Sequence, residues 1–207
     1  MNELIALVAG YLLGSIPFGY LAGRVKSVDI RTLGSGNVGA ANVFRNLGRS
    51  WGIAVMACDI GKGVAGVLIG RALTDDPWPI FVAAAVMVGA IFPVWLRFRG
   101  GKGVAAGAGV MIGLFPLVSA LLVPLWLLIV LVFRITSLAS VATAVAFTPL
   151  AAAFGAPWQY LVLAGAMSLL VLLRHRANIG RLLAGKEARI DLRRPGRAAT
   201  PPPGPNV

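Results

Sequence analysis

The chain has 207 residues, of which 58% are hydrophobic and 13% are charged, about half the charged share of a typical soluble domain. Together with a mean hydropathy of +0.84, these values exclude a disordered chain and indicate an integral membrane protein. A single cysteine, Cys58, and a single histidine, His175, exclude a disulfide framework and a cysteine- or histidine-rich metal centre. The net charge of +12 suits a cytoplasmic face against anionic lipid better than a nucleic-acid partner.

Runs of about 20 mostly apolar residues predict membrane-spanning helices. In chain order these runs are 4–23, 51–70, 80–96, 137–154 and 158–173. The first run follows Glu3 and has no basic segment before it, so it does not resemble a signal peptide. Four tryptophans fall near predicted ends, as interface anchors do: Trp51, Trp78, Trp95 and Trp158.

The apolar stretch 104–133 is too long for one span, because a helix of that length would be about 45 Å long. The hydrocarbon core is only about 30 Å thick, and Pro116 breaks an intrahelical hydrogen bond inside the stretch. We therefore interpret the stretch as two short helices joined near Pro116. The prediction is an all-α polytopic membrane protein with about seven transmembrane helices.

The distribution of charge predicts the orientation. With the N-terminus outside, seven crossings place all but two of the 19 basic residues on the cytoplasmic side, the exceptions being Lys62 and Arg71. A single crossing by 104–133 would move the basic C-terminal cluster outside. Residues 1–192 then form one membrane-embedded domain with a cytoplasmic C-terminus. The Arg-, Ala- and Pro-rich residues 193–207 are predicted to be a disordered cytoplasmic tail.

Three polar loops fall on the same, cytoplasmic side, and the first is rich in glycine. Glycines allow backbone N–H groups to turn toward an anion, and an arginine adds a fork suited to phosphate. The candidate residues are Gly34, Ser35, Gly36, Asn37, Gly39, Asn42 and Arg45. The spacing of the three glycines also matches a dinucleotide fingerprint, but no strand precedes it. The simpler alternative is a flexible loop with a helix cap.

The second loop contains Gly100, Gly101, Lys102 and Gly103, directly before a helix predicted to start near Val104. A glycine-rich turn, a lysine and a helix N-terminus together form an anion site. The spacing does not fit a Walker A loop. A basic interfacial turn that contacts lipid head groups is an equally simple interpretation.

The third loop follows the last predicted span and contains His175, Asn178 and Arg181. A lone histidine at a helix C-terminus is often only a cap for the helix dipole. Its position on the same side as the other two loops favours a functional role. Glu187, an acid in the basic C-terminal part, is interpreted as a neutralising partner for a neighbouring base.

Two polar pairs lie inside predicted spans. Asp59 and Lys62 are three residues apart, so they share a helix face and either pair with each other or face a polar cavity. Ser137 and Ser140 have the same spacing, and such serines more often pack or cap than bind ligands. None of the three loops contains a carboxylate or an obvious nucleophile, which argues against a bound metal and favours phosphate-bearing substrates.

The sequence resembles the bacterial acyl-phosphate:glycerol-3-phosphate acyltransferases of the PlsY type. The resemblance runs in order from about Leu4 to Glu187. It includes residues 14–19, 35–39 with Asn42 and Arg45, Asp59 with Lys62 and Gly63, 100–105, 137–140, and 175–181 with Gly185 and Glu187. One departure is Ala41, where the family usually has threonine.

The resemblance implies acyl transfer from acyl phosphate to the sn-1 hydroxyl of glycerol 3-phosphate, without a cofactor. It assigns glycerol 3-phosphate to Arg45, Lys102, Ser140, His175 and Asn178, and the donor head group to Ser35, Asn37, Gly36, Gly100 and Gly101. The base is either His175 or a substrate phosphate. Implied partners are the two substrates, membrane lipid and the enzyme that makes acyl phosphate, in a bacterial inner membrane. A transporter or channel for phosphorylated anions is the alternative, followed by a non-catalytic scaffold.

Overall fold

The computed structural model describes residues 1–191, and all regular secondary structure within that range is helical. In chain order the elements are α1 (Asn2–Ser15), α2 (Phe18–Val25), η1 (Ile30–Thr32), α3 (Ala40–Leu47), α4 (Arg49–Leu73), α5 (Trp78–Ile91), η2 (Val94–Leu96), α6 (Val104–Leu114), α7 (Pro116–Phe133), α8 (Thr136–Ala153), α9 (Trp158–Arg174) and α10 (Arg176–Leu183). The predicted tail 193–207, and with it the domain boundary after residue 192, lies outside the described residues.

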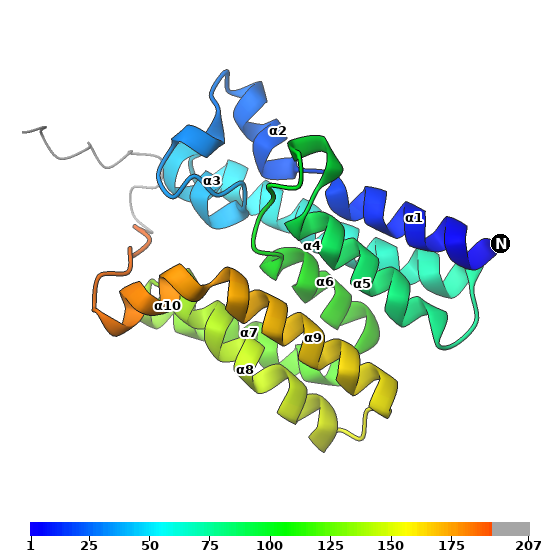
Figure 1. Ribbon diagram of the computed structural model, residues 1–207. Helices are drawn as coiled ribbons and strands as arrows, with labels where there is room; N and C mark the ends of the chain where they lie inside the picture. Colours follow the sequence, from blue (N-terminus) through cyan, green and yellow to red (C-terminus); the bar gives the residue numbers. More distant parts are fainter. Residues whose placement is uncertain (192–207) are drawn as a thin grey trace, which may run out of the picture.

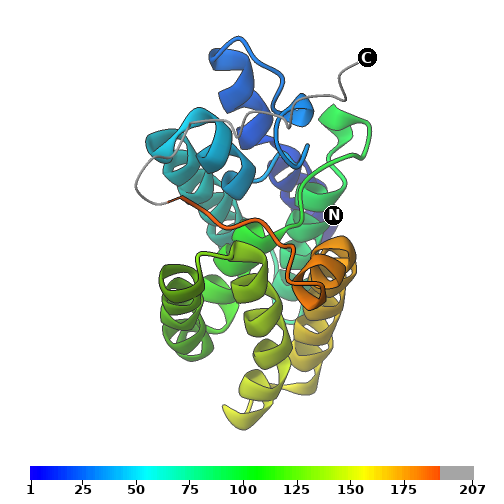
Figure 2. The ribbon, with the colours of Figure 1, turned by 90° about the vertical axis from the view of Figure 1, so that its left-hand side faces the viewer.

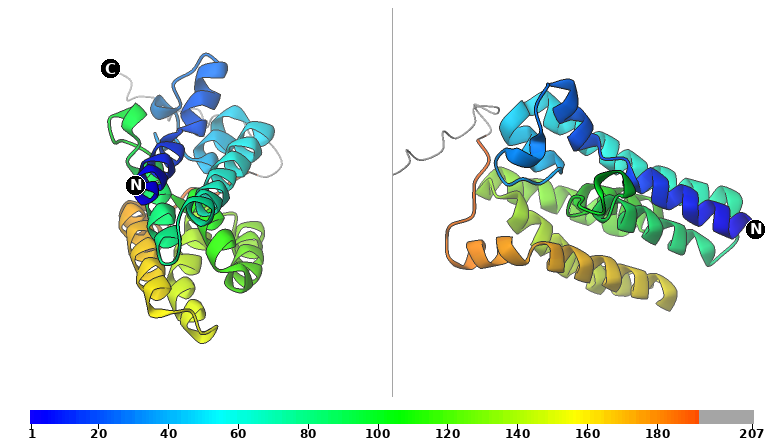
Figure 3. Two further views of the ribbon diagram at one scale, coloured as in Figure 1. Left: turned by 90° about the vertical axis from the view of Figure 1, so that its right-hand side faces the viewer. Right: turned by 45° about the horizontal axis from the view of Figure 1, so that its top comes forward.

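The long helices run side by side, and the short helices gather at one end of the bundle (Figure 1). That end, called the loop end below, carries α2, α3 and α10, whereas the N-terminus lies at the opposite end. Figure 2 looks onto the loop end and shows the segment after α10 crossing it toward α3. The right-hand view of Figure 3 shows the same segment rising from α10. The three predicted polar loops therefore share one end of the molecule.

Five helical segments of residues 1–191 are long and apolar enough to cross a membrane: Asn2–Val25, Arg49–Leu73, Trp78–Leu96, Pro116–Phe133 and Thr136–Ala153. The pair α9 and α10, bent by 63°, brings the number to six if it counts as one span. The predicted separation near Pro116 is present, because α6 ends at Leu114 and α7 begins at Pro116.

The seven predicted segments are all helical, but they are not all full spans. Helix α6 has 11 residues and is therefore about 16 Å long, roughly half of the hydrocarbon thickness. The first span is also interrupted, since α1 ends at Ser15 and α2 starts at Phe18 after Pro17. Proline has no N–H to continue the ladder of hydrogen bonds, which explains the interruption.

Glycines allow the helices to approach backbone to backbone. A Cβ atom on Gly14 of α1 would lie 2.1 Å from the Val86 carbonyl oxygen of α5. A Cβ on Gly109 of α6 would lie 2.0 Å from the Ile60 carbonyl oxygen of α4. Small residues at helix contacts are typical of membrane proteins, where dispersion contacts rather than water exclusion hold the helices together. The outer faces stay apolar: on α7, for example, Leu131 is 63% exposed, as a lipid-facing side chain should be.

Candidate active site

A cavity of about 1280 Å³ opens at the loop end. Its walls come from the α1–α2 break, the loop before α3, α3 itself, α4, the start of α6, α7, α8, the α9–α10 corner and residues 187–191. Every residue predicted for the site lines this cavity except Gly36 and Gly100. The structure therefore brings together three loops that lie far apart in the sequence.

The buried Asn42 side chain organises the glycine-rich loop. Its Nδ2 donates to the carbonyl oxygens of Ile30 (3.2 Å) and Leu33 (3.0 Å). Its Oδ1 accepts from the backbone N–H of Ser35 (3.1 Å) and from Nδ2 of Asn46 (3.0 Å). All the hydrogen bonds expected of one amide are thus made within the chain. Asn42 therefore holds the shape of the loop. A substrate contact was predicted for it, but its amide has no donor left for a ligand.

Glycine is required at the start of this loop. Gly34 has φ of +54°, and a Cβ there would lie 2.6 Å from Oδ1 of Asn42. Oδ1 of Asn37 accepts from the N–H of Gly39 at 2.8 Å, so the loop turns on itself directly before α3. Gly36 has its N–H on the Leu33 carbonyl (2.9 Å), consistent with its position outside the cavity wall.

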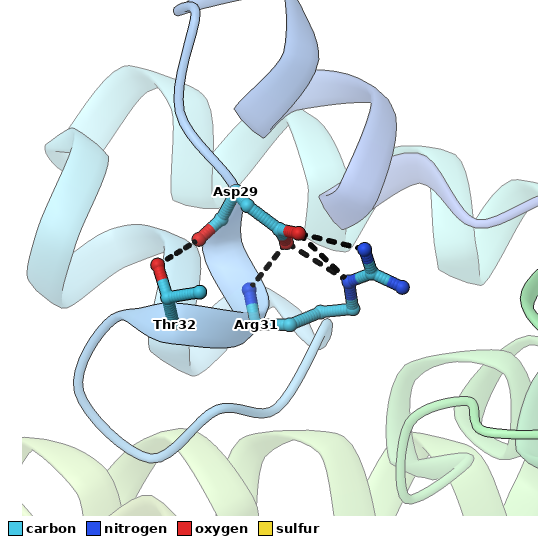
Figure 4. Close-up of polar contacts among 3 residues, drawn as sticks. All are labelled: Asp29, Arg31 and Thr32. Atoms are coloured by element: carbon cyan, nitrogen blue, oxygen red, sulfur yellow. Dashed lines mark hydrogen bonds and ion pairs between the residues drawn. The ribbon is translucent and has the colours of Figure 1, made fainter.

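The segment that precedes the loop in the chain is fixed by a local ion pair (Figure 4). Asp29 accepts from the backbone N–H of Arg31 (3.0 Å) and pairs with the Arg31 guanidinium (2.6 Å), while Thr32 donates to the Asp29 carbonyl (2.9 Å). The Arg31 hydrogen bonds hold the pKa of the Asp29 carboxyl below its usual range. The Ile30 carbonyl that receives Asn42 is therefore held from both sides.

In the second loop, two glycine N–H groups are already used. Gly100 donates to the Ile91 carbonyl (3.1 Å) and Gly101 to the Ala90 carbonyl (3.2 Å), which closes the C-terminal end of α5. Their carbonyl oxygens accept from the Arg174 guanidinium at 3.4 and 3.2 Å. Both glycines therefore serve to place Lys102, and their N–H groups are not free for the anion site predicted in this loop.

The start of α6 has the geometry that the predicted anion site requires, and Gly103 forms its N-cap. Gly103 has φ of +77° and caps α6, and residues 103–106 line the cavity. The first N–H groups of a helix have no acceptor inside that helix, so the start of α6 presents donors and a positive dipole to the cavity. Lys102 stands directly before them.

A chain of hydrogen bonds crosses the cavity from Lys102 to Glu187. Lys102 Nζ donates to Oδ1 of Asn178, and Nδ2 of Asn178 donates to Glu187 (2.5 Å). Glu187 also accepts from Ser137 Oγ (2.8 Å) and Arg181 Nε (2.6 Å), and its side chain is only 5% exposed. Glu187 thus neutralises a base, as predicted, but it also sets the orientation of the Asn178 amide, so that Asn178 presents its oxygen to the lysine.

Burial lowers the pKa of Lys102 to about 8, a shift that Glu187 opposes and that the nearby Arg181, Arg45 and Arg174 reinforce. Burial likewise lowers the pKa of Arg45, although a guanidinium remains charged. Burial opposes ionisation of Glu187, but its hydrogen bonds from Asn178, Ser137 and Arg181 outweigh this and keep the pKa of that carboxyl below its usual value. The cavity is therefore electropositive and lacks enough negative charge to balance its cations.

Arg45 is one of the cations that are not balanced. Its Nε is buried and has no hydrogen-bond partner within residues 1–191. A buried N–H without an acceptor costs about 1–3 kcal/mol, and an anion in the cavity would supply the missing acceptor. Arg45 and Lys102 thus line an electropositive cavity with donor capacity in reserve.

Two further predicted residues have partners in the chain. His175 is 3% exposed and lies at the α9–α10 corner, with Nδ1 2.8 Å from the Val171 carbonyl oxygen. A carbonyl only accepts, so Nδ1 carries a proton, and a neutral ring then has Nε2 as an acceptor. Ser140 Oγ donates to the Thr136 carbonyl (2.9 Å) and accepts from Trp126 Nε1 (3.2 Å).

Sequence reasoning missed Arg174, which fixes the second loop, and discounted Ser137, which orients Glu187. Arg174 had a detectable signal in its place at the end of the last span, next to His175. Ser137 had only its three-residue spacing from Ser140. Within residues 1–191 no three His, Cys, Asp or Glu side chains gather as metal ligands would.

The comparisons with known proteins agree with this geometry. The model of the family described as glycerol-3-phosphate acyltransferase matches residues 4–185. The chain belongs to this family. A glycerol-3-phosphate acyltransferase of Caulobacter vibrioides (strain NA1000 / CB15N) is 44% identical over 203 residues, covering 96% of this chain and 93% of the relative. One of Synechococcus sp. (strain CC9902) is 42% identical over 192 residues, covering 92% and 96%.

Two solved structures of PlsY (YgiH), an integral membrane glycerol 3-phosphate acyltransferase, are 38% identical to the chain. Its glycerol 3-phosphate form superposes with a TM-score of 0.88 and its lysophosphatidic acid form with 0.85, each covering 92% of this chain and 96% of the other. The predicted resemblance to the PlsY type is confirmed, and with it the prediction of a membrane acyltransferase of phospholipid synthesis.

Proposed function

We propose that the protein transfers a fatty acyl group from acyl phosphate to the sn-1 hydroxyl of glycerol 3-phosphate, forming lysophosphatidate and inorganic phosphate. The observation that carries the proposal is the buried, electropositive cavity, in which Arg45 has an unpartnered Nε and burial lowers the pKa of Lys102. Two phosphate-bearing substrates would restore the charge balance of such a cavity.

The acceptor phosphate fits best between α3, the second loop and α10. Arg45 and Lys102 supply charge, Asn178 supplies a hydrogen-bonding amide, and His175 and Ser140 line the same cavity. An arginine offers two parallel N–H groups to a phosphate, whereas lysine acts as a point charge. These contacts would hold the sn-1 hydroxyl at a fixed distance from the donor, which is worth more than any single contact in a two-substrate reaction.

The donor head group fits the other side of the cavity. Ser35 and Asn37 on the glycine-rich loop and the N–H groups at the start of α6 can stabilise the charge that develops on the carbonyl oxygen. In the reaction, the hydroxyl oxygen bonds to the carbonyl carbon, and the bond from that carbon to the phosphate oxygen breaks. Phosphate leaves with the electron pair, so no enzyme nucleophile is needed.

The hydroxyl proton has two candidate acceptors, His175 or an oxygen of a bound substrate phosphate. The partner of His175 is the Val171 carbonyl rather than a carboxylate, so the imidazolium would gain little stabilisation in this buried position. This favours the substrate phosphate. Replacing His175 with Gln decides between them, since near-full turnover at saturating substrate would leave the histidine without the role of base.

The acyl chain has an apolar path out of the cavity. Ile53 and Met56 of α4 and Leu127 and Val130 of α7 line the same cavity as the polar loops. An acyl chain between these two helices would reach lipid without crossing a polar layer. This path supports delivery of the acyl phosphate from the membrane, and the enzyme that makes acyl phosphate is the expected functional partner.

For the orientation, we propose that the loop end faces the cytoplasm of a bacterial inner membrane and that the N-terminus lies outside. The basic residues of the three loops support this, because they lie at the loop end opposite the N-terminus. On this view α6 runs away from the loop end and α7 returns to it, because the start of α6 and the start of α8 both line the cavity. A reporter fusion or tag at the N-terminus that is accessible from the periplasm would support this orientation, and one accessible only from the cytoplasm would reverse it.

The reaction is tested with purified protein, palmitoyl phosphate and glycerol 3-phosphate, by measuring phosphate release together with lysophosphatidate. Turnover in the parent, and its loss in Arg45→Ala and Lys102→Ala, is the expected result. Acyl-CoA and acyl carrier protein replace acyl phosphate in parallel reactions and should give no product. Product from acyl-CoA would overturn the donor assignment, and flux of glycerol 3-phosphate into proteoliposomes without any product would favour the transporter.

A further inference from the structure

Asp59 and Lys62 in α4 remain outside the roles described above. Lys62 Nζ lies 2.7 Å from Oδ1 of Asp59, and the two side chains are only 5% and 15% exposed, respectively. Both residues line the cavity. Ionised side chains this deep in a membrane protein are costly and are generally tied to function. The ion pair predicted from their spacing is present, but it does not account for all of the contacts that Lys62 makes.

Lys62 has a second partner on another helix. Its Nζ donates to the carbonyl oxygen of Ile16 (3.0 Å), 46 residues earlier in the chain. Ile16 lies in the break between α1 and α2, where the N–H of Phe18 is its other donor (3.2 Å). The ammonium also lies 5.7 Å from the centre of the Phe18 ring. Lys62 therefore fixes the conformation of the break from two sides.

The break leads directly to the glycine-rich loop. One residue after Phe18, Gly19 packs so closely on Val38 that a Cβ on Gly19 would lie 1.8 Å from the Val38 carbonyl oxygen. Val38 follows Asn37 in the loop and is itself buried. A shift of the start of α2 would therefore push against the backbone that carries Asn37.

Helix α3 has further anchors of its own, in addition to its contacts with the loop. Asn42 is bonded to the Ile30 and Leu33 carbonyls, and Phe44 packs on Gly52 of α4 so tightly that a Cβ there would lie 2.4 Å from the Phe44 Cβ. Arg45 is on this helix. A change at Lys62 should thus move the loop residues before α3 more than Arg45.

From these contacts we infer that Lys62, held by Asp59, is a positioning residue that sets the donor side of the site: through the Ile16 carbonyl and the Gly19–Val38 contact it places Ser35 and Asn37. The inference rests on the proposed function for the names of the two substrates. It does not require Lys62 to touch either of them.

The first readout does not depend on activity. Hydrogen exchange is measured by mass spectrometry for peptides covering residues 34–39 and 40–47 in the parent, Lys62→Met and Lys62→Arg. The N–H groups of Gly36 and Gly39 are hydrogen-bonded within the loop and that of Ser35 to Asn42 of α3, so their exchange reports the order of the loop. We expect faster exchange over 34–39 in Lys62→Met, unchanged exchange over 40–47, and restoration of the parent pattern in Lys62→Arg, which keeps a charged donor.

The second readout is kinetic. Lys62→Met should lower kcat/KM for acyl phosphate by about 10–100-fold, since a displacement on the order of 1 Å has effects of this size. The KM for glycerol 3-phosphate should stay at the parent value, and Lys62→Arg should recover most of the lost activity.

Gly19→Ala enters the same path without touching the ion pair and should reproduce the faster exchange over 34–39 and the loss in donor kinetics. Its Cβ would also lie 3.2 Å from Val43 of α3, so the exchange over 40–47 is compared only between the Lys62 variants. The matched control is Gly70→Ala. Gly70 lies on α4, as Lys62 does, but outside the cavity, and a Cβ there would lie 2.9 Å from Cα of Pro79 in α5. It should lower the melting temperature without the selective change in exchange or in the donor kinetics.

The outcomes separate the two hypotheses. A parent without turnover would end the proposed function, while the exchange experiment would still decide the role of Lys62. Unchanged exchange over 34–39 in both Lys62→Met and Gly19→Ala would overturn the positioning role. So would equal losses toward both substrates, or donor kinetics in Gly70→Ala that fall as far as in Lys62→Met.

Discussion

The low pKa of Lys102 predicts a pH dependence that can be traced to one side chain. Burial among three arginines lowers the pKa of Lys102 to about 8, and only the charged form can bind a phosphate as a cation. The contribution of Lys102 is therefore fully present well below pH 8 and is lost as the pH rises through about 8. An ordinary exposed lysine would titrate near 10.4, outside the range of the assay.

The size of the effect follows from the titration. At pH 9, one unit above a pKa of about 8, roughly a tenth of the free enzyme retains the charge. We therefore expect kcat/KM for glycerol 3-phosphate to fall by about tenfold for each pH unit above 8. Bound phosphate favours the charged lysine, so the alkaline limb of kcat should lie at a higher pH than that of kcat/KM.

The assay measures lysophosphatidate formation between pH 6 and 10, with an enzyme-free blank at each pH for spontaneous loss of acyl phosphate. Lys102→Arg keeps a cation that does not titrate in this range, so its residual activity should lack the alkaline limb. Glu187→Gln removes the carboxylate that raises the pKa of Lys102, so its limb should move to lower pH. A parent profile that is flat to pH 10, or the same limb in Lys102→Arg, would show that Lys102 does not control it.

Three further changes test the architecture of the site. Glu187→Gln turns an amide nitrogen or a neutral oxygen toward Arg181 and frees Asn178, so kcat/KM should fall at least tenfold, with activity measured at pH 6.5 to exclude the shifted limb; parent-like activity would leave Glu187 without a positioning role. Asn42→Ala removes four hydrogen bonds that hold the glycine-rich loop and should cost about 2–4 kcal/mol, seen as a lower midpoint in a thermal melt; an unchanged midpoint would contradict this. Gly103→Ala forces a positive φ and a Cβ 2.8 Å from Ile91, so both the melting temperature and the activity should drop, whereas Gly180→Ala, with open space around it, should change neither.

Patterns that depend only on neighbouring residues were readable before the structure. Hydropathy predicted the apolar helices, and the missing N–H of Pro116 predicted the break between α6 and α7. Because successive segments end on opposite sides of the membrane, the sequence also predicted that the three polar loops share one side. Lengths were less reliable, since α6 is too short to be the full span that seven crossings required. A run of apolar letters does not record where a helix tucks against its neighbours and stops.

Contacts within a loop were also partly predictable. Lys102 and Gly103 line the cavity directly before α6, as the predicted anion site requires. This was predictable because the first N–H groups of any helix have no acceptor within that helix. Gly100 and Gly101 differ: their N–H groups close the end of α5, nine and eleven residues earlier in the chain. Glycine composition alone cannot distinguish an amide that binds a ligand from one that satisfies a carbonyl.

The sequence by itself determined that this is a membrane protein with cationic, glycine-rich loops at one face, because composition, charge asymmetry and motif spacing are properties of the linear chain. The acyltransferase activity was implied by the resemblance of those motifs to the PlsY type. Only the tertiary structure decided how the charges are arranged. Asn178 is turned by Glu187, Lys62 is tied to Ile16, and Arg45 has a donor in reserve. Each of these facts depends on which distant backbone or side chain comes within hydrogen-bond distance, and that distance is set by how the helices pack.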